Sequence, residues 1–158
     1  MSDLAKMHNE KYKESRLAGL PGWGGSDRVA NADVAFEIAD VTNLSNIPSR
    51  SFDIVFDGNC LHCLIGEKRN TAFQEIYRVL KPNGILFVSS LSASQSDPQF
   101  PENFDSQSRV LLNEGVPYRY IPTPDSLERE IVDCGFTVLN RFIRTDSPFG
   151  HSSIHFKK

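Results

Sequence analysis

The stretch FDIVFDGNCLHCLIGEKRNTAFQEIYRVLKPNGILFVSSL, residues 52–91, decides the fold of this chain. It opens with a short apolar run, Ile54 to Phe56, which ends abruptly at Asp57 and Gly58. Such a run is typical of a strand that is buried on both faces of a parallel sheet. Apolar residues then recur at helical spacing and form one stripe: Ala72, Phe73, Ile76, Val79 and Leu80. The pattern predicts a strand, a polar loop and an amphipathic helix.

A turn and a second strand follow the helix. Pro82 cannot continue a helix, and Asn83 and Gly84 tolerate the positive φ angles of a tight turn. Residues 85–88 form another apolar, β-prone run. A strand, a helix and a strand joined by short links form a right-handed βαβ unit. Ligands of open α/β sheets bind beyond the carboxyl ends of the strands, where this order places Asp57, Gly58, Asn59 and His62.

These motifs resemble the second half of a class I S-adenosylmethionine-dependent methyltransferase. FDIVFDGNCLHCL, residues 52–64, and RVLKPNGILFVSS, residues 78–90, match the family's strand–loop–helix–turn–strand pattern in order and spacing. Asn83 stands where the family has its first turn glycine. FEIADV, residues 36–41, resembles the preceding strand, which in the family ends in an acid beside the adenine. The resemblance implies an α/β, Rossmann-like sheet that is mostly parallel and ends in an antiparallel hairpin.

The family's glycine-rich cofactor turn and its ribose-binding acid have no counterpart in this sequence. Residues 22–25, Gly-Trp-Gly-Gly, follow Pro21 and no apolar strand, so we interpret them as a surface loop. Ser2-Asp3-Leu4 resembles the stretch just after the ribose-binding acid. We therefore expect residues 1–158 to form one partial methyltransferase domain that is truncated at its N-terminus.

The C-terminal half predicts an insertion, a helix and a hairpin. Residues 92–123 are polar and proline-containing, which predicts a long loop or insertion whose aromatic side chains we expect to tether it. Tyr118, Arg119 and Tyr120 fit either an acceptor contact or a half-exposed strand. Thr123 followed by proline is a good helix start. Residues 136–143 and 151–156 are expected to form the antiparallel hairpin.

The resemblance implies four cofactor-binding residues. Asp40 would accept a hydrogen bond from the adenine amino group and Val41 would donate its backbone N–H, whereas Asp57 and Gly58 would lie near the methionine moiety and the methyl group. The alternative for both aspartates is structural, since Asp commonly caps a turn. Asp53 lies at the strand's entrance, and we assign it a structural role only.

His62 is the weak candidate for a catalytic residue. Its imidazole could act as a general base, because the pKa of histidine lies near neutrality. In the family, the matching Leu-His more often packs beneath the cofactor and orients the loop. Cys60 and Cys63 flank His62, but a structural zinc needs four ligands and no second pair exists. We expect no metal and interpret both cysteines as small buried residues.

Composition narrows the class of protein. The chain has 158 residues, a net charge of -3 and 23% charged residues, so it lacks the excess of positive charge that is typical of a nucleic-acid-binding protein. No apolar run reaches membrane-spanning length. Three cysteines suit a reducing, cytoplasmic compartment better than a disulfide framework.

Two functions of different classes remain open. The first is methyl transfer from S-adenosylmethionine to a small-molecule acceptor, with weak or absent cofactor binding by this chain alone. The second is a non-catalytic methyltransferase-like remnant that serves as a protein-interaction or dimerisation module. Without the family's central strands, we expect strand edges and part of the helix face to lack cover, which favours self-association.

Overall fold

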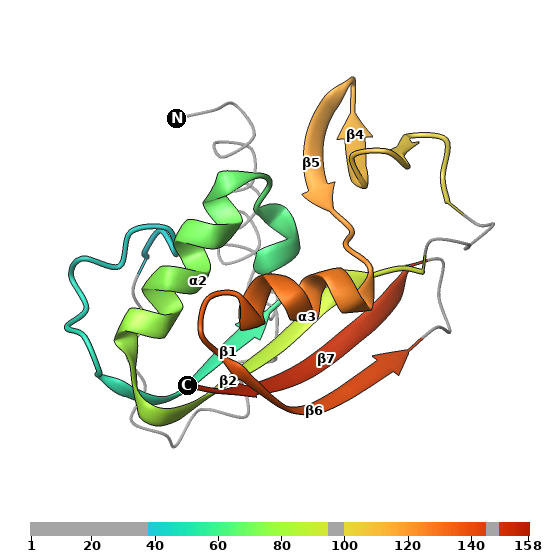
Figure 1. The fold of residues 1–158 in the computed structure, drawn as a ribbon. Helices are drawn as coiled ribbons and strands as arrows, with labels where there is room; N and C mark the ends of the chain where they lie inside the picture. Colours follow the sequence, from blue (N-terminus) through green and yellow to red (C-terminus); the bar gives the residue numbers. More distant parts are fainter. Residues whose placement is uncertain (1–37, 95–99, 145–148) are drawn as a thin grey trace, which may run out of the picture. The chain divides into compact units, whose positions relative to one another are not determined.

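The computed structural model describes residues 38–94, 100–144 and 149–158 (Figure 1). The chain divides into two compact units, and residues 39–158 form the second, to which the following description applies. Residues 36 and 37 of the expected strand at 36–41 lie outside the described residues, as do the glycines at 22–25. Ile38 and Ala39 belong to no strand.

Four strands form the main sheet, in the order β1-β2-β7-β6. They span Phe52–Gly58 (β1), Leu80–Ser92 (β2), Thr137–Arg144 (β6) and Gly150–Lys157 (β7). β1 and β2 pair in parallel, with Gly58 opposite Ser89, whereas β7 pairs antiparallel with both β2 and β6. The predicted α/β fold is confirmed, with the parallel βαβ unit and the C-terminal hairpin in their expected places. In the described residues the sheet is mixed, with one parallel and two antiparallel pairings, and not mostly parallel as expected.

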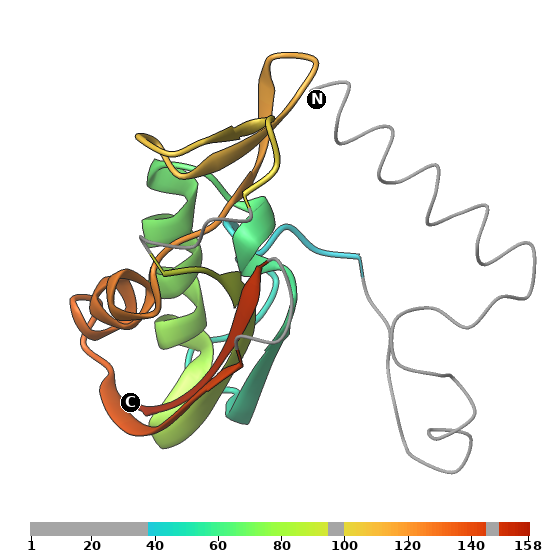
Figure 2. The same cartoon turned by 90° about the vertical axis from the view of Figure 1, so that its right-hand side faces the viewer.

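Two helices, α2 (Glu67–Val79) and α3 (Pro124–Val132), cover the same face of this sheet (Figures 1 and 2). The Thr123 side chain caps α3 by accepting from the backbone N–H of Ser126 at 3.1 Å. Asn83 takes a φ of 64° in the turn inside β2, so this asparagine, and not Gly84, supplies the left-handed backbone. A short 3-10 turn, η2 (Leu61–Cys63), lies between β1 and α2.

The core lies between the helices and the sheet. Buried side chains from the α2 stripe, α3 and strands β2 and β7 form one cluster: Ala72, Phe73, Ile76, Leu80, Leu86, Val88, Leu127, Ile131, Ile154 and Phe156. The expectation that the α2 face lacks cover is therefore wrong. α3 and the alternate, inward-facing residues of β2 and β7 complete the packing around it.

The insertion forms a second, three-stranded sheet. β3 (Phe104–Asp105), β4 (Val110–Asn113) and β5 (Val116–Tyr120) pair antiparallel in the order β3-β4-β5. Phe100 stacks on Phe104 with ring centroids 4.1 Å apart, and both rings lie near Phe149. The aromatic side chains therefore tether the insertion, and Tyr118 to Tyr120 form a strand.

The edge strand β1 carries exposed apolar side chains, as does the other edge strand, β6. Phe52, Ile54 and Phe56 alternate along β1 with exposed fractions of 42%, 59% and 68%. Their alternation places them on one face of the strand, opposite the face that carries buried Asp57. No helix in the described residues is long and apolar enough to cross a membrane.

Candidate active site at the carboxyl end of the parallel strands

Asp57 lies at the carboxyl end of β1 and is 6% exposed. Its Oδ1 accepts hydrogen bonds from the backbone N–H groups of Cys60 and Leu61 at 2.8 and 3.1 Å, and so fixes the loop toward η2. Its Oδ2 is buried without a hydrogen-bond partner among the described residues. Burial raises the pKa of this carboxyl group, because desolvation disfavours its charged form. One carboxylate oxygen thus serves the loop and the other is left for a further donor.

His62 lies on η2 and is 2% exposed. The Arg119 guanidinium, from β5, donates to its Nε2, whereas its Nδ1 is buried without a partner in the part of the chain that the structure describes. Burial, followed by the charge of Arg119, lowers the pKa of His62 from 6.5 to about 4. His62 is therefore neutral near pH 7, and its Nε2 lone pair is already engaged. This geometry favours a supporting role over that of a general base.

Asp40 caps a turn. Its Oδ1 accepts from the backbone N–H and the hydroxyl of Thr42 at 2.9 and 2.7 Å. These hydrogen bonds lower the pKa of the Asp40 carboxyl group. Val41, next in sequence, is partly buried against the main core. Asp40 thus has the structural role that the sequence left open, and its contact with adenine stays a prediction.

Glu75 and Arg78 of α2 hold the loop after this turn. Glu75 accepts from the backbone N–H of Leu44 at 2.8 Å, and Arg78 donates to the backbone carbonyl groups of Leu44 and Ile47. Glu75 also pairs with Arg78 at 2.9 Å. The Arg78 side chain and the Leu44 N–H lower the pKa of Glu75 to about 2, so this carboxylate is charged at neutral pH. The loop after Val41 is thereby fixed to α2.

A polar chain across three strands was missed by the sequence analysis. Asn59 follows β1 with a φ of 73°, and its Oδ1 lies 3.0 Å from Nε2 of His151. The other His151 ring nitrogen lies 3.4 Å from the Ser89 hydroxyl. Burial lowers the pKa of His151. These residues lie together because antiparallel β7 begins at the edge where β1 and β2 end, a pairing that no local motif signals.

The two cysteines of the loop differ from their expected burial. Cys60 and Cys63 are exposed free thiols, because η2 turns them away from the core while burying Leu61 and His62. Asp53, in contrast, is exposed at the entrance of β1 and pairs with Lys81 at 2.7 Å, which fits its structural assignment. In residues 38–94, 100–144 and 149–158, no group of three or more His, Cys, Asp or Glu side chains is arranged to hold a metal ion.

The comparison with known proteins settles the family. A family model described as a methyltransferase domain matches residues 6–88, which is more than half of the chain. The chain belongs to this methyltransferase family. The match confirms the relationship predicted from the strand and turn motifs, and S-adenosylmethionine is the cofactor of the class.

Two curated relatives are methyltransferases from different organisms. This methyltransferase domain is 29% identical over 90 residues to phosphoethanolamine N-methyltransferase of Plasmodium falciparum, covering 56% of the chain and 32% of the relative. It is 27% identical over 123 residues to ubiquinone/menaquinone biosynthesis C-methyltransferase of Pasteurella multocida, covering 65% of the chain and 46% of the relative. The chain thus spans from a third to just under half the length of these relatives.

Solved methyltransferases share the fold. A SAM-dependent methyltransferase from Methanosarcina mazei superposes with a TM-score of 0.67 at 17% identity, covering 78% of this chain and 66% of that chain. The Burkholderia thailandensis 1,6-didemethyltoxoflavin-N1-methyltransferase, solved with bound 1,6-didemethyltoxoflavin and S-adenosylhomocysteine, superposes with a TM-score of 0.65 at 20% identity, covering 88% of this chain and 57% of that chain. At these identities, the similarity establishes the fold alone.

Proposed function

We propose that this methyltransferase domain takes part in methyl transfer from S-adenosylmethionine to a small-molecule acceptor, with the cofactor at the carboxyl ends of β1 and β2. When bound, the cofactor supplies an electrophilic methyl group. The observation that carries the proposal is the unpaired Oδ2 of Asp57, a buried acceptor at the edge where α/β sheets bind ligands. A buried acceptor without a partner costs about 1–3 kcal/mol, which a cofactor donor would recover.

In this proposal, the two carboxylate oxygens of Asp57 have different roles. Oδ1 holds the backbone N–H groups of Cys60 and Leu61 and so fixes the loop. Oδ2 accepts a hydrogen bond from an amino or hydroxyl group of the cofactor. Gly58, the next residue, presents bare backbone to the ligand. An added Cβ at this position would make a tight contact, 3.1 Å from the ring of the exposed Phe56.

Asp40 and Val41 would serve the adenine end. The Thr42 hydrogen bonds keep the Asp40 carboxylate charged and fixed in orientation, which suits an acceptor for an exocyclic amino group. The backbone N–H of Val41 would donate to a ring nitrogen. The contacts of Glu75 and Arg78 with the following loop hold this turn against α2.

His62 is proposed as a positioning residue. Methyl transfer depends on in-line alignment more than on proton transfer, so an ordered loop contributes directly to the rate. The Arg119 contact with His62 links the insertion sheet to that loop. A small-molecule acceptor would approach from the loops at this edge. The two curated relatives carry names that differ in the acceptor, and we assign none of their substrates to this chain.

A matched pair of variants tests the assignment of Asp57. Asp57→Asn keeps one oxygen that can accept from the loop but replaces the other oxygen with an NH2 group, which cannot accept a hydrogen bond. Asp53→Asn makes the same change at the opposite end of β1. We expect Asp57→Asn to weaken S-adenosylhomocysteine binding about tenfold or more, which is the loss of affinity expected when a hydrogen bond to a charged group is removed. Asp53→Asn should leave the affinity unchanged. Equilibrium dialysis with labelled ligand measures both. Equal affinities for the two variants would remove Asp57 from the site.

A further inference from the structure

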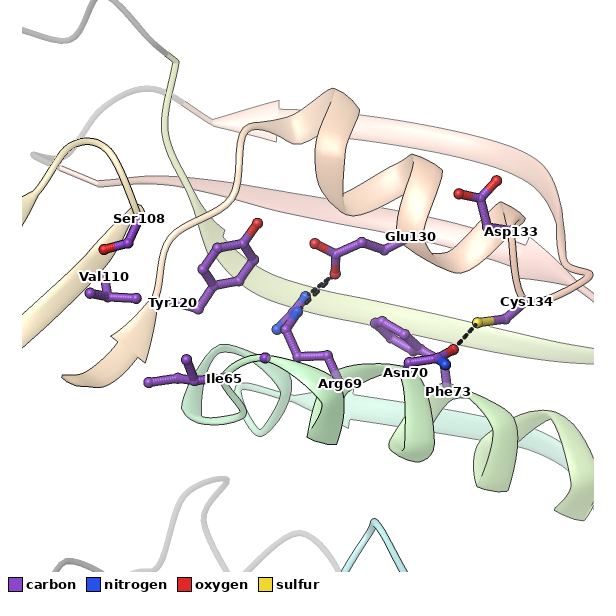
Figure 3. Close-up of a pocket in the computed structure, with 11 residues that line it drawn as sticks. Ile65, Arg69, Asn70, Phe73, Ser108, Val110, Tyr120, Glu130, Asp133 and Cys134 are labelled. Carbon is purple, nitrogen blue, oxygen red and sulfur yellow. Dashed lines mark hydrogen bonds and ion pairs between the residues drawn. The ribbon is translucent and has the colours of Figure 1, made fainter.

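A cavity of about 540 Å³ lies between α2, α3 and the insertion sheet (Figure 3). α2 contributes Arg69, Asn70 and Phe73 to its walls, and the C-terminal end of α3 contributes Glu130 and Asp133. Volumes of this size are typical of pockets that enclose small molecules. Its lining is not part of the candidate active site.

β5 separates this cavity from the candidate active site. Arg119 donates to His62, whereas Tyr120, the next residue, lines the cavity and lies against the Arg69 guanidinium, 4.7 Å from its ring centroid. Successive side chains of a strand point to opposite sides, so the two contacts lie on opposite faces of β5. A ligand in the cavity would therefore bind at a site separate from the candidate active site.

An ion pair between Arg69 and Glu130 lies in the middle of the cavity lining, between Tyr120 and Phe73 (Figure 3). Arg69 donates its Nε–H to Oε2 of Glu130 at 2.8 Å, and its Nη1 donates to the Leu61 carbonyl at 2.5 Å. The Arg69 side chain is nearly buried, with 6% exposed. The Arg69 Nη2 lies 2.7 Å from the Glu130 carboxylate but has no hydrogen-bond partner of good geometry among the described residues, so Glu130 is the group that balances its charge.

The end of the cavity at the C-terminus of α3 carries unbalanced negative charge, on the solvent-exposed Asp133. Asp133 lines the cavity and forms no ion pair among the described residues, while the Cys134 thiol donates to Oδ1 of Asn70 at 3.4 Å. Phe73 supplies buried apolar surface between the ion pair and Asp133, and Val110 supplies it on the other side of the ion pair (Figure 3). With Arg69 and Glu130 neutralising each other, the lining has an excess charge of about -1.

We propose that this cavity is a second binding site for a small ligand that combines an aromatic or aliphatic body with a cationic amine. The body would contact the apolar lining, and the amine would lie at Asp133. The site is independent of the proposed methyl transfer, since neither its lining nor its charge depends on the cofactor.

Phenethylamine is the probe, and 3-phenylpropionate is its anionic counterpart. Cys134 lines the cavity, whereas Cys60 and Cys63 lie on the η2 loop outside its lining. We expect phenethylamine, at concentrations on the order of a millimolar, to slow alkylation of Cys134 but not of the other two thiols, as mapped by mass spectrometry on the full chain. We expect 3-phenylpropionate to protect Cys134 at least about fivefold less well.

Charge variants complete the test. Asp133→Asn should weaken the protection of Cys134 by phenethylamine about two- to fivefold, which is the loss of affinity expected when an exposed ion pair is removed. Glu102→Gln removes one negative charge outside the cavity and should leave the protection unchanged. Asp133→Asn removes an acid from a helix C-terminus and should not unfold the chain. Absent protection of Cys134, equal protection of all three thiols, equal protection by the anion, or full protection in Asp133→Asn would each overturn the proposal.

Discussion

Asp57 and His62 are two buried ionisable residues whose pKa values shift in opposite directions for the same reason. Desolvation raises the pKa of the Asp57 carboxyl group and lowers that of the His62 imidazole, so both shifts favour the neutral form. Each retains one buried atom without a partner among the described residues, Oδ2 and Nδ1 respectively. Such atoms are rare in proteins. Here one lies at the carboxyl end of β1 and the other on the η2 turn that follows.

His62 should stay neutral far below the ordinary titration range of histidine. We expect its ring resonances, followed by NMR, to titrate near pH 4. Because the folded pKa is lower than the unfolded value of 6.5, the free energy of unfolding is at its full value above pH 6.5. It should fall as the pH decreases from there toward 4.

The control for this prediction is His62→Gln, whose amide oxygen can accept from Arg119 but cannot titrate. Its thermal stability should vary less between pH 6.5 and 4 than that of the parent chain. A His62 ring that titrates near 6.5 in the folded chain would mean that it is neither desolvated nor held by Arg119.

The sequence predicted which polar residues lie at the strand ends, but it did not predict which residues they form hydrogen bonds with. The run that ends at Asp57 placed this carboxylate at the carboxyl end of a parallel strand from sequence alone, and the backbone capping by its Oδ1 follows from local geometry. The contacts of His62 with Arg119 and of Asn59 with His151 join residues 57 and 92 positions apart. No local pattern encodes such distances, because the sheet order brings the residues together.

At the scale of elements, local signals determined the helices well. The apolar stripe at helical spacing predicted α2, and the cap and proline predicted the start of α3. The insertion sheet escaped prediction, because its strands are only two to five residues long and β5 contains Pro117. Tertiary contacts stabilise it instead, including hydrogen bonds from Arg109 to the Ile121 and Ala93 carbonyl groups.

Removing the α3 cap tests the local account of that helix. Thr123→Ala loses the hydrogen bond from the Ser126 N–H and should lower the free energy of unfolding by about 1 kcal/mol. Thr71→Ala is the matched control, because Thr71 is exposed within α2 and donates only to the Glu67 carbonyl of its own helix. That change should be close to neutral, since alanine has the higher helix propensity. Urea denaturation measures both, and equal losses would contradict the capping role.

At the scale of the whole molecule, the sheet has a protected side and an exposed edge. α2 and α3 bury one face, while β1 presents Ile54 and Phe56 without cover and has β2 as its only strand neighbour in the described sheet. Apolar edge strands tend to pair with other chains. We therefore expect the purified chain to self-associate through β1.

A charge on this edge should reverse the association. Phe56→Lys places an ammonium group on the exposed face of β1, and light scattering should then show a smaller mean mass at equal protein concentration. Val116→Lys provides the control, because Val116 is also apolar and exposed but lies in the insertion sheet. A concentration-independent monomer in the parent chain, or an equal effect of the two variants, would contradict the role of β1.

The most direct test of the central claim is a map of backbone amide NMR shifts during titration with S-adenosylhomocysteine. Because the sequence lacks the family's glycine-rich turn and ribose acid, we predict weak binding, with a dissociation constant above about ten micromolar. The largest shifts should fall at Asp40, Val41 and residues 57–61, at the carboxyl end of β1. A dissociation constant in the low micromolar range, or shifts confined to residues outside these two segments, would contradict this account.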